Sequence, residues 1–462
     1  MGRTNTRVRW RVFAAALLAA GVVVGPVTTP AVADDTVRER QWHLDAMHAP
    51  EMWQVSKGQG ITVAVIDGGF RLDHPDLVGQ FLPGKDFSGS PGGVGSFNDG
   101  HGTEMSSLIA GTGRGVGGTG AYGLAPAAKI LPLKINNGAA GAPTSAEFLD
   151  QIGQAVNYAV DQGAKVINIS QGMAAARTSP GDVAKLDRIL ATARAKGSLV
   201  VASVGNEAQS GNPLSYPGGL PNVVGVGASD RNGTVTAESE YGPHVVLVAP
   251  GMDMFAACTS STEYCKSHGT SDAAALVSAS AALVWSVHPN WTANQILRVL
   301  INTASKATNG ATRTDDGGYG AVRPRIALTD PGDPGPADVS PIPVATPSPS
   351  APASPSSTPS ATASAAPSSS DAPVAAPSAE PKVADKTSDS GSSLPIVAAV
   401  VAGLVLVAGA VFVLVRRRKT VEQAPQAAHV PPVPQQAGAA TPPPPPPSYE
   451  PPAPSGDNPY TR

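Results

Sequence analysis

The sequence predicts an α/β protein with a three-layer architecture: a parallel sheet with helices on both faces, joined to a disordered linker and one transmembrane helix. Short runs that are apolar throughout recur between residues 61 and 248, and such runs suit strands that are buried on both faces. Helical patterns alternate with these runs, which implies parallel pairing through right-handed crossovers. A longer apolar run near residue 400 contains no charge and predicts the membrane helix.

The apolar runs define six expected strands, and the patterns between them define five expected helices. The strands are expected at residues 61–66, 129–135, 165–170, 198–204, 222–227 and 245–248. The helices are expected at residues 103–111, 145–162, 183–196, 271–287 and 292–304. Functional groups collect at the carboxyl ends of the strands in a sheet of this kind, so reactive residues are sought there.

The N-terminal residues have the pattern of a secretory signal. Four arginines between Arg3 and Arg11 precede an apolar run over residues 12–24, and Ala31-Val32-Ala33 supplies small residues for cleavage. We expect a signal peptide over residues 1–33, cut before Asp34. A retained membrane anchor is the alternative, but the apolar run is short for the roughly 20 residues that a span needs.

The second apolar run, residues 394–415, is long enough to span a bilayer and is followed by the basic cluster 416–419. The basic cluster predicts a cytoplasmic C-terminal side, so we expect a single-pass protein of the cell membrane with residues 34–393 outside. A buried core helix is less consistent with this run, because it has no polar face. A sortase-type wall anchor is also less consistent, because Ile396 follows Leu394-Pro395 where LPxTG is required.

Glycine and proline divide the chain into two kinds of polymer. The 462 residues include 50 Gly and 46 Pro, and most Gly lie before residue 331 while most Pro lie after it. The Pro-, Ser- and Ala-rich part of residues 306–393 has few large apolar residues, which predicts a disordered linker.

The net charge of −3 gives no reason to expect nucleic acid as a partner, and two Cys exclude a disulfide scaffold.

Three reactive side chains lie at strand ends or helix starts. Asp67 follows the first strand, His101 begins a helix, and Ser271 begins another. A serine nucleophile needs an imidazole to take its proton and a carboxylate to orient that imidazole. Asn206, directly after the strand at 198–204, offers an amide donor to a developing oxyanion, and the N–H at the Ser271 helix start offers a second. Each signal alone is more often a turn or a cap, but their order within one parallel domain predicts nucleophilic catalysis.

On these residues the chain resembles the subtilisin-like serine proteases over about residues 40–305. The matching motifs include AVIDGG at 64–69, DGHGTEMSSLIAG at 99–111, SVGN at 203–206 and HGTSDAAA at 268–275. The resemblance implies peptide-bond hydrolysis by a triad of Asp67, His101 and Ser271, with Asn206 as the oxyanion donor. It also implies that two segments bind an extended peptide substrate: Ser170, Gln171 and Gly172, and Ala202, Ser203 and Val204. His268 is a second candidate base, but the geometry of the helix start directs it elsewhere.

The resemblance implies no cofactor. Calcium commonly stabilises the family, and structural calcium stays open here. No acidic loop has convincing ligand spacing, however, so no specific metal site is predicted.

The order of segments is similar to that of the mycosins, membrane-anchored subtilases associated with type VII secretion. We expect the signal peptide, an N-terminal extension packed on the head (34–58), a peptidase domain (59–305), a tail with the linker (306–393), the membrane helix (394–415) and a cytoplasmic Pro-rich tail (416–462). The implied partners are protein or peptide substrates, the membrane and the type VII secretion membrane complex. Two functions remain open: an endopeptidase acting on exported proteins, and a weakly active or non-catalytic structural subunit of that complex.

Two features beside Ser271 modify this expectation. The family usually places an apolar residue after the serine, where this chain has Asp272. A carboxylate facing the site disfavours an oxyanion and stabilises protonated His101, so we expect slow and narrow proteolysis.

Cys258 and Cys265 are close in sequence and exported, so a disulfide that closes a small loop is expected, with free thiols as the alternative.

Overall fold

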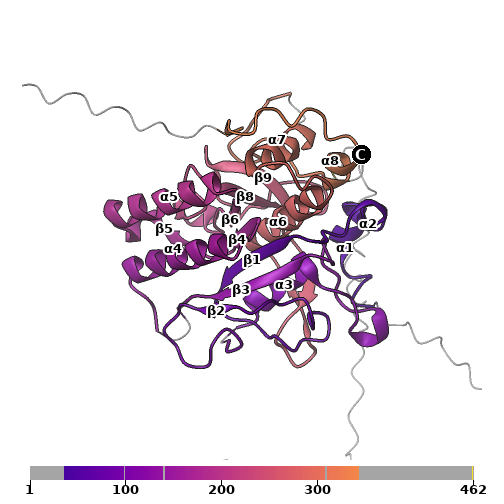
Figure 1. Ribbon diagram of the computed structural model, residues 1–462, viewed down its shortest axis with the longest axis horizontal. Coiled ribbons are helices and arrows are strands. Elements are labelled where there is room, and N and C mark those ends of the chain that lie inside the picture. Colours follow the sequence, from indigo (N-terminus) through magenta and orange to yellow (C-terminus); the bar gives the residue numbers. More distant parts are fainter. Residues whose placement is uncertain (1–35, 98, 139–140, 307–309, 343–459, 461–462) are drawn as a thin grey trace, which may run out of the picture. The chain divides into compact units, whose positions relative to one another are not determined.

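The computed structural model describes residues 36–97, 99–138, 141–306, 310–342 and 460 (Figure 1). The predicted signal peptide and membrane helix lie outside these residues, as do most of the predicted linker and cytoplasmic tail. Tyr460, from that tail, is buried beside Ser229 with the two hydroxyl oxygens 2.6 Å apart.

Seven parallel strands form the central sheet, in the order β2-β3-β1-β4-β6-β8-β9. Their bounds are β1 (Thr62–Asp67), β2 (Lys85–Asp86), β3 (Lys129–Lys134), β4 (Val166–Ile169), β6 (Leu199–Ser203), β8 (Val224–Ser229) and β9 (Val245–Pro250). The six strands expected from the apolar runs are present within a few residues of their expected bounds. The two-residue β2 was missed because it is too short to leave a pattern.

Helices cover both faces of the sheet, which confirms the predicted three layers (Figure 1). On one face lie α4 (Ser145–Asp161) and α5 (Pro180–Ala195). The other face is covered by α3 (His101–Ala110), α6 (Thr270–Val287) and α7 (Ala293–Thr303). Alternation along β1 explains why its whole run is apolar: Val63 and Val65 enter the core beneath α6, while Ala64 and Ile66 enter the core beneath α4.

The central helix α6 is buried around nearly its whole circumference because the domain encloses it. Among the described residues it is the one helix long and apolar enough to cross a membrane, but 83% of its apolar window is buried inside the domain. Ala, Ser and Val dominate this helix, and such small side chains let it pack closely on β4, β6, β8 and β9. The helix that carries Ser271 is therefore a core helix.

Capping residues fix where the outer helices begin. The Thr144 side chain accepts from the Glu147 N–H, and the Glu147 carboxylate accepts from the Thr144 N–H, which forms a capping box at the start of α4. Thr292 and Gln295 form the same arrangement at α7. Ser179 caps α5 ahead of Pro180 at its first turn.

The segment before β1 folds against the rest of the domain through α1 (Trp42–Ala46) and α2 (Ala49–Val55). Leu44 and Met52 are fully buried in the core that contains α6. The Trp53 indole N–H donates to the carbonyl of Leu124 at 2.9 Å. A short C-terminal helix, α8 (Pro324–Thr329), lies against α2, α6 and α7.

Two small antiparallel sheets and three short 3₁₀ turns lie outside the main sheet. The strands β10 (Met254–Ala257) and β11 (Tyr264–Ser267) form a hairpin, whereas β5 (Met173–Ala174) pairs with β7 (Ser215–Tyr216) across an intervening segment that contains α5 and β6. The turns are η1 (Val116–Gly118), η2 (Ala175–Arg177) and η3 (Ala208–Ser210). The β10–β11 hairpin leads directly into α6, so it sets the approach of the chain to Ser271.

Candidate active site

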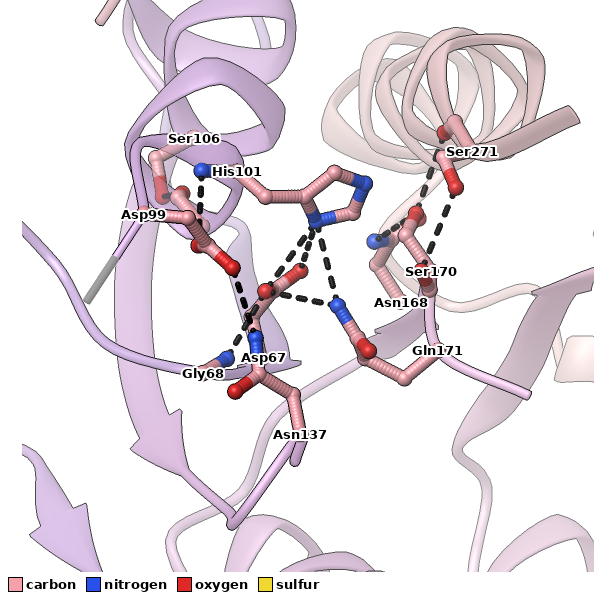
Figure 2. A network of polar contacts seen from close by, with 11 residues as sticks. Asp67, Gly68, Asp99, His101, Ser106, Asn137, Asn168, Ser170, Gln171 and Ser271 are labelled. Carbon is pink, nitrogen blue, oxygen red and sulfur yellow. Dashed lines mark hydrogen bonds and ion pairs between the residues drawn. The ribbon is translucent and has the colours of Figure 1, made fainter. Parts of the chain in front are cut away.

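The carboxyl ends of three adjacent strands converge with two helix starts at one place in the molecule (Figure 2). Neighbours in the sheet, β1, β4 and β6, end at or just before Asp67, Ser170 and Asn206 respectively. His101 is the first residue of α3, and Ser271 lies in the first turn of α6. Residues up to about 200 positions apart in the chain therefore meet at one edge of the sheet.

Asp67 and His101 form an acid–imidazole pair in which the imidazole is partly exposed. The His101 Nδ1 lies 2.9 Å from Asp67 Oδ2 and 3.1 Å from Oδ1, and the Asp67 side chain is fully buried. Gly102 makes this close approach possible, because a Cβ there would lie 2.4 Å from the carbonyl oxygen of Gly69 and 3.0 Å from Asp67 Cβ. The pairing leaves the second ring nitrogen, Nε2, on the side of Ser271 (Figure 2).

Gln171 adds a donor to this pair that the sequence did not reveal. Its Nε2 donates to Asp67 Oδ1 at 2.9 Å and lies 3.2 Å from His101 Nδ1. The N–H of Gly68 donates to the same oxygen at 2.7 Å. Two donors besides the imidazole therefore fix the Asp67 carboxylate, which holds the ring of His101 in one orientation.

The Ser271 hydroxyl rests against the end of β4. Its Oγ donates to the carbonyl of Ser170 at 3.2 Å, and the Ser170 hydroxyl donates to the carbonyl of Ser271 at 3.0 Å (Figure 2). A rotation about the Cα–Cβ bond of Ser271 is the movement that turns the hydroxyl toward His101. Bonds between a nucleophile and its base commonly tighten only when substrate is bound.

Asn206 is held so that its amide NH₂ group remains available. Its Oδ1 accepts from both the N–H and the hydroxyl of Thr270, each at 2.9 Å. The carbonyl half of the amide is thus used within the protein, and Nδ2 is the half that can donate to a ligand. The N–H of Ser271, in the first turn of α6, is a second donor because early helical N–H groups lack a helical acceptor.

A cavity of about 510 Å³ opens beside Ser271 and runs between the segments after β4 and β6. Its lining residues include His101, Ser170, Gln171, Gly172, Ser203, Asn206, Glu207, Ser215 and Ser271. Four of the six residues expected to bind substrate therefore line it. The side chains of Ala202 and Val204 do not, because Ala202 is buried in the core on one face of the sheet, while Val204, beyond the end of β6, is buried in the core on the other. Only their backbone groups remain to contact a peptide.

Asp272 is buried at the start of α6 and does not face open solvent. Its Oδ1 accepts from the Ser267 hydroxyl at 2.5 Å. Burial raises the pKa of Asp272 to about 6, against the opposing effects of the Ser267 hydrogen bond and the His101 charge. Glu104, on the first turn of α3, is likewise desolvated, and burial raises its pKa to about 7.

The imidazole of His101 is surrounded by acidic groups. Burial lowers the pKa of His101, but the charge and hydrogen bond of Asp67 oppose burial, and the charges of Asp272 and Glu104 add to them. The pKa is raised to about 9. A base must be deprotonated to accept a proton, and the raised pKa favours the protonated form of His101 near neutral pH. The acidic surroundings of His101 agree in direction with the slow hydrolysis near neutral pH that we expect from Asp272.

We predict that Asp272→Asn moves the acid limb of the kcat/KM profile to lower pH. The substitution removes a charge that stabilises protonated His101 and keeps an acceptor for Ser267. Each unit by which the pKa of His101 falls raises kcat/KM at pH 7 about tenfold. Profiles from pH 5 to 10 measure the shift, with Asp150→Asn on the surface of α4 as the charge-matched control. An unchanged limb in the Asp272 variant contradicts the prediction.

The structure contains a disulfide between Cys258 and Cys265, which closes the β10–β11 hairpin ahead of Ser271. Glu104 and the two sulfur atoms lie within 4.8 Å of one another, a grouping that resembles a metal site. Sulfur atoms joined in a disulfide offer no thiolate ligand, so this group does not fit a metal ion.

His268, the second candidate base, pairs with Glu238 at 2.9 Å and is exposed.

A hydrogen-bond network fixes the loop that precedes β3. Asp76, which is fully buried, accepts from the N–H groups of Gly115 and Ala121 and from the hydroxyl of Tyr264. Tyr264 belongs to β11, so this carboxylate ties the loop to the hairpin that carries the disulfide. The three donors satisfy a charge whose burial would otherwise be costly.

Comparison with known proteins places these features in a family. The model of the subtilase family matches residues 58–322. Thermitase of Thermoactinomyces vulgaris is 32% identical over 281 residues, which are 60% of this chain and 93% of that protein. The MycP3 protease from a type VII (ESX-3) secretion system shares 32% identity with a TM-score of 0.53, covering 62% of this chain and 87% of that one.

A second solved structure is the serine protease MycP1, described as an essential component of the type VII (ESX-1) secretion system. It shares 29% identity with a TM-score of 0.55, covering 64% of this chain and 90% of that one. The family match includes all the strands of the central sheet and both helices that carry His101 and Ser271. The chain therefore belongs to the subtilase family and is a subtilisin-like serine endopeptidase related to the MycP proteases of type VII secretion systems.

Proposed function

We propose that this protein is a membrane-anchored serine endopeptidase that cleaves exported proteins outside the cytoplasmic membrane, in association with a type VII secretion complex. Asp67, His101 and Ser271 form its catalytic triad, and Asn206 is its oxyanion donor. The observation that carries the proposal is the convergence of these four residues at one edge of the sheet. Two of these arrangements are already formed without substrate: Asp67 is bonded to His101, and the Asn206 amide is held by Thr270.

In the proposed reaction the Ser271 Oγ attacks the carbonyl carbon of the scissile peptide bond, and His101 Nε2 accepts the hydroxyl proton. Asp67 holds Nδ1 and stabilises the imidazolium that forms. The negative oxygen of the tetrahedral intermediate accepts from Asn206 Nδ2 and the Ser271 N–H. His101 then gives its proton to the departing amine, and water hydrolyses the acyl-enzyme by the same steps in reverse order.

The cellular placement rests on the sequence and on similarity. The predicted signal peptide and membrane helix support an extracytoplasmic head, and the MycP relatives support a connection with type VII secretion. The contact between Ser229 and Tyr460 conflicts with this topology, because a span at residues 394–415 separates the two residues by a membrane. In a chain that crosses the membrane at residues 394–415, Ser229 and Tyr460 lie on opposite sides of the membrane and do not form this contact.

One labelling experiment tests both the chemistry and the placement. We expect a membrane-impermeant biotinylated fluorophosphonate, added to intact spheroplasts, to modify Ser271 of the wild type. The Ser271→Ala variant is expected to remain unlabelled, and a C-terminal epitope tag is expected to resist protease added outside. Label that appears only after lysis contradicts the placement. The absence of label in lysed cells, with the protein folded, contradicts the catalytic proposal.

A further inference from the structure

A site shaped for a tyrosine side chain lies beside α8, and the triad does not use it. Tyr460 occupies this site with 3% of its surface exposed and packs against the core that contains α6. Its apolar walls include Met47, Val322 and Ile326, and the cavity that these residues share with the ring measures about 10 Å³. Such a small remaining volume means that the phenol ring nearly fills the site.

The inner end of the site is polar. The Tyr460 hydroxyl oxygen lies 2.6 Å from Ser229 Oγ, and Ser229 is fully buried. Ser229 Oγ donates its own proton to the carbonyl of Ala249 at 3.2 Å, so the phenol O–H donates to Ser229. Apolar walls with one hydrogen-bond acceptor at the inner end match a phenol side chain better than a benzyl one. We call Met47, Ser229, Val322 and Ile326 the tyrosine pocket.

The tyrosine pocket lies at the edge of the sheet that carries the active site. Ser229 ends β8, which is parallel to the strands that end at Asp67 and before Ser170. The Gly251 N–H donates to the Ser229 carbonyl at 2.9 Å, and the Gly269 N–H, directly before α6, donates to the Gly251 carbonyl at 2.7 Å. None of the four pocket residues lines the cavity beside Ser271. The pocket is therefore separate from the substrate cavity but close to the start of the helix that carries the nucleophile.

The chain itself offers no occupant for this pocket when it spans the membrane. The proposed topology places Tyr460 in the cytoplasm and the pocket outside, and the same holds for Tyr460 of a second copy. The segments placed outside but not described in the structure, residues 34–35, 98, 139–140, 307–309 and 343–393, contain no Tyr, Phe or Trp. An unfilled cavity of this size is destabilising, and its filling by a side chain that also donates to Ser229 is favourable.

We propose that the tyrosine pocket is a docking site for a tyrosine side chain of another, exported polypeptide. This inference rests on the topology in the proposed function, because it is the membrane that withdraws Tyr460 from the pocket. A polypeptide held there by one tyrosine lies at the same edge of the sheet as the triad. Docking therefore raises the local concentration of its neighbouring segments at the cleft without using the cleft for recognition.

A photo-crosslinking peptide tests the proposal on the full chain in its membrane. The probe is a biotinylated peptide with the sequence of residues 457–462, Asp-Asn-Pro-Tyr-Thr-Arg, that carries a diazirine group at its N-terminus. It is added to intact spheroplasts beside two companions that have Phe or Ala in place of the tyrosine. Mass spectrometry locates the crosslinks, which we expect on the segments around Met47 and residues 322–326.

The three peptides separate the contribution of the ring from that of the hydroxyl. We expect half-maximal crosslinking by the Phe peptide to need a concentration about two- to tenfold above that of the Tyr peptide, because one neutral hydrogen bond is lost. The Ala peptide is expected to need a concentration at least about thirtyfold higher, because the buried ring is also lost. The chain with Tyr460→Ala should bind the Tyr peptide as tightly as the wild type, since the membrane already keeps Tyr460 away.

A variant of the pocket assigns the preference for the hydroxyl. Ser229→Ala is expected to bring the ratio between the Phe and Tyr peptides close to one while the Phe peptide keeps its affinity. Damage to the fold would instead weaken both peptides. Ser280→Ala is the matched control, since it removes another buried hydroxyl, which donates within α6, and it should leave the ratio unchanged. The peptide series on the wild type needs no variant, so it decides the question even where Ser229→Ala does not fold.

Three results overturn the inference. Tyr and Ala peptides of equal strength do so, as do crosslinks that lie outside the pocket. A ratio between the Phe and Tyr peptides that folded Ser229→Ala retains removes the role of Ser229. In these cases the labelling of Ser271 and the protease resistance of the C-terminal tag are unaffected, so the proposed function survives.

Crosslinking that appears only in the Tyr460→Ala chain shows that the protein's own tail fills the pocket. That result also contradicts the proposed topology, and the C-terminal tag should then be open to protease added outside. Labelling of Ser271 by the fluorophosphonate reports on catalysis in every case, independently of the pocket.

Discussion

Replacing Ser271 by Ala is expected to lower kcat for peptide hydrolysis by about 10⁶, since removing the serine of subtilisin, a family relative, costs about 2 × 10⁶. The variant keeps the Asn206 amide and the N–H donors, so a residual acceleration over the uncatalysed reaction is expected to remain. Steady-state kinetics on a peptide recovered from co-exported proteins measures the loss. Ser271 lies in the first turn of α6, and its hydroxyl donates a hydrogen bond of 3.2 Å to the Ser170 carbonyl, so losing the hydroxyl should change stability little.

Ser280→Ala is the matched control for that experiment. Ser280 lies on the same helix, and its hydroxyl donates to the helical carbonyl of Leu276, remote from the strand ends. It should keep wild-type kcat. The double variant Ser271→Ala/His101→Ala should lose no more activity than either single variant, because the two groups act in one step. If the double variant loses the product of the two single-variant factors, the proposed triad is wrong. Export in a strain that carries Ser271→Ala is a separate test: export that persists indicates a structural role for the protein apart from cleavage.

Removal of the Asn206 side chain is the second large change. We expect Asn206→Ala to lower kcat by about 10²–10³ with little change in KM, because the amide donates to the oxygen only when negative charge develops on it. The geometry supports this assignment: both bonds that Asn206 Oδ1 accepts come from Thr270, next to the nucleophile. The amide is thereby oriented before any substrate arrives, and little reorganisation accompanies the reaction.

Two further measurements separate this electrostatic role from a structural one. Asn222→Ala removes a half-buried amide whose Nδ2 donates to Asp187 of α5, and it should leave kcat unchanged. Thermal unfolding reports whether loss of the Asn206–Thr270 bonds loosens the start of α6. If Asn206→Ala raises KM and leaves kcat intact, the side chain binds substrate in its ground state and the oxyanion assignment is wrong.

The fold was accessible from the sequence because its signals are local. Strands buried on both faces favour continuous apolar runs, and β1 and β6 have them at residues 63–66 and 199–202. The starts of three outer helices were expected at residues 145, 183 and 292, and α4, α5 and α7 begin at Ser145, Pro180 and Ala293. The hairpin of β10 and β11 and the two-residue strands were missed, because pairs this short leave no periodic pattern.

Substrate lining was predicted less well than the reactive groups. Gln171 was expected to face a peptide, and it does line the cavity, but its amide also donates to Asp67. Ala202 and Val204 were expected beside the peptide, yet their side chains are buried on opposite faces of the sheet. A motif identifies a segment, whereas the direction of each side chain depends on the pleat of the strand and on its neighbours.

The sequence by itself determined the parallel α/β architecture and the order of Asp67, His101, Asn206 and Ser271, because apolar periodicity and short motifs are properties of neighbouring residues. Only the tertiary structure decided the burial and the charged surroundings of those groups. The burial of Asp272 beside Ser267 and the acidic surroundings of His101 depend on which side chains meet in space and on their access to water. Charge interactions depend on distance in space and on desolvation, and neither quantity exists until the chain has folded.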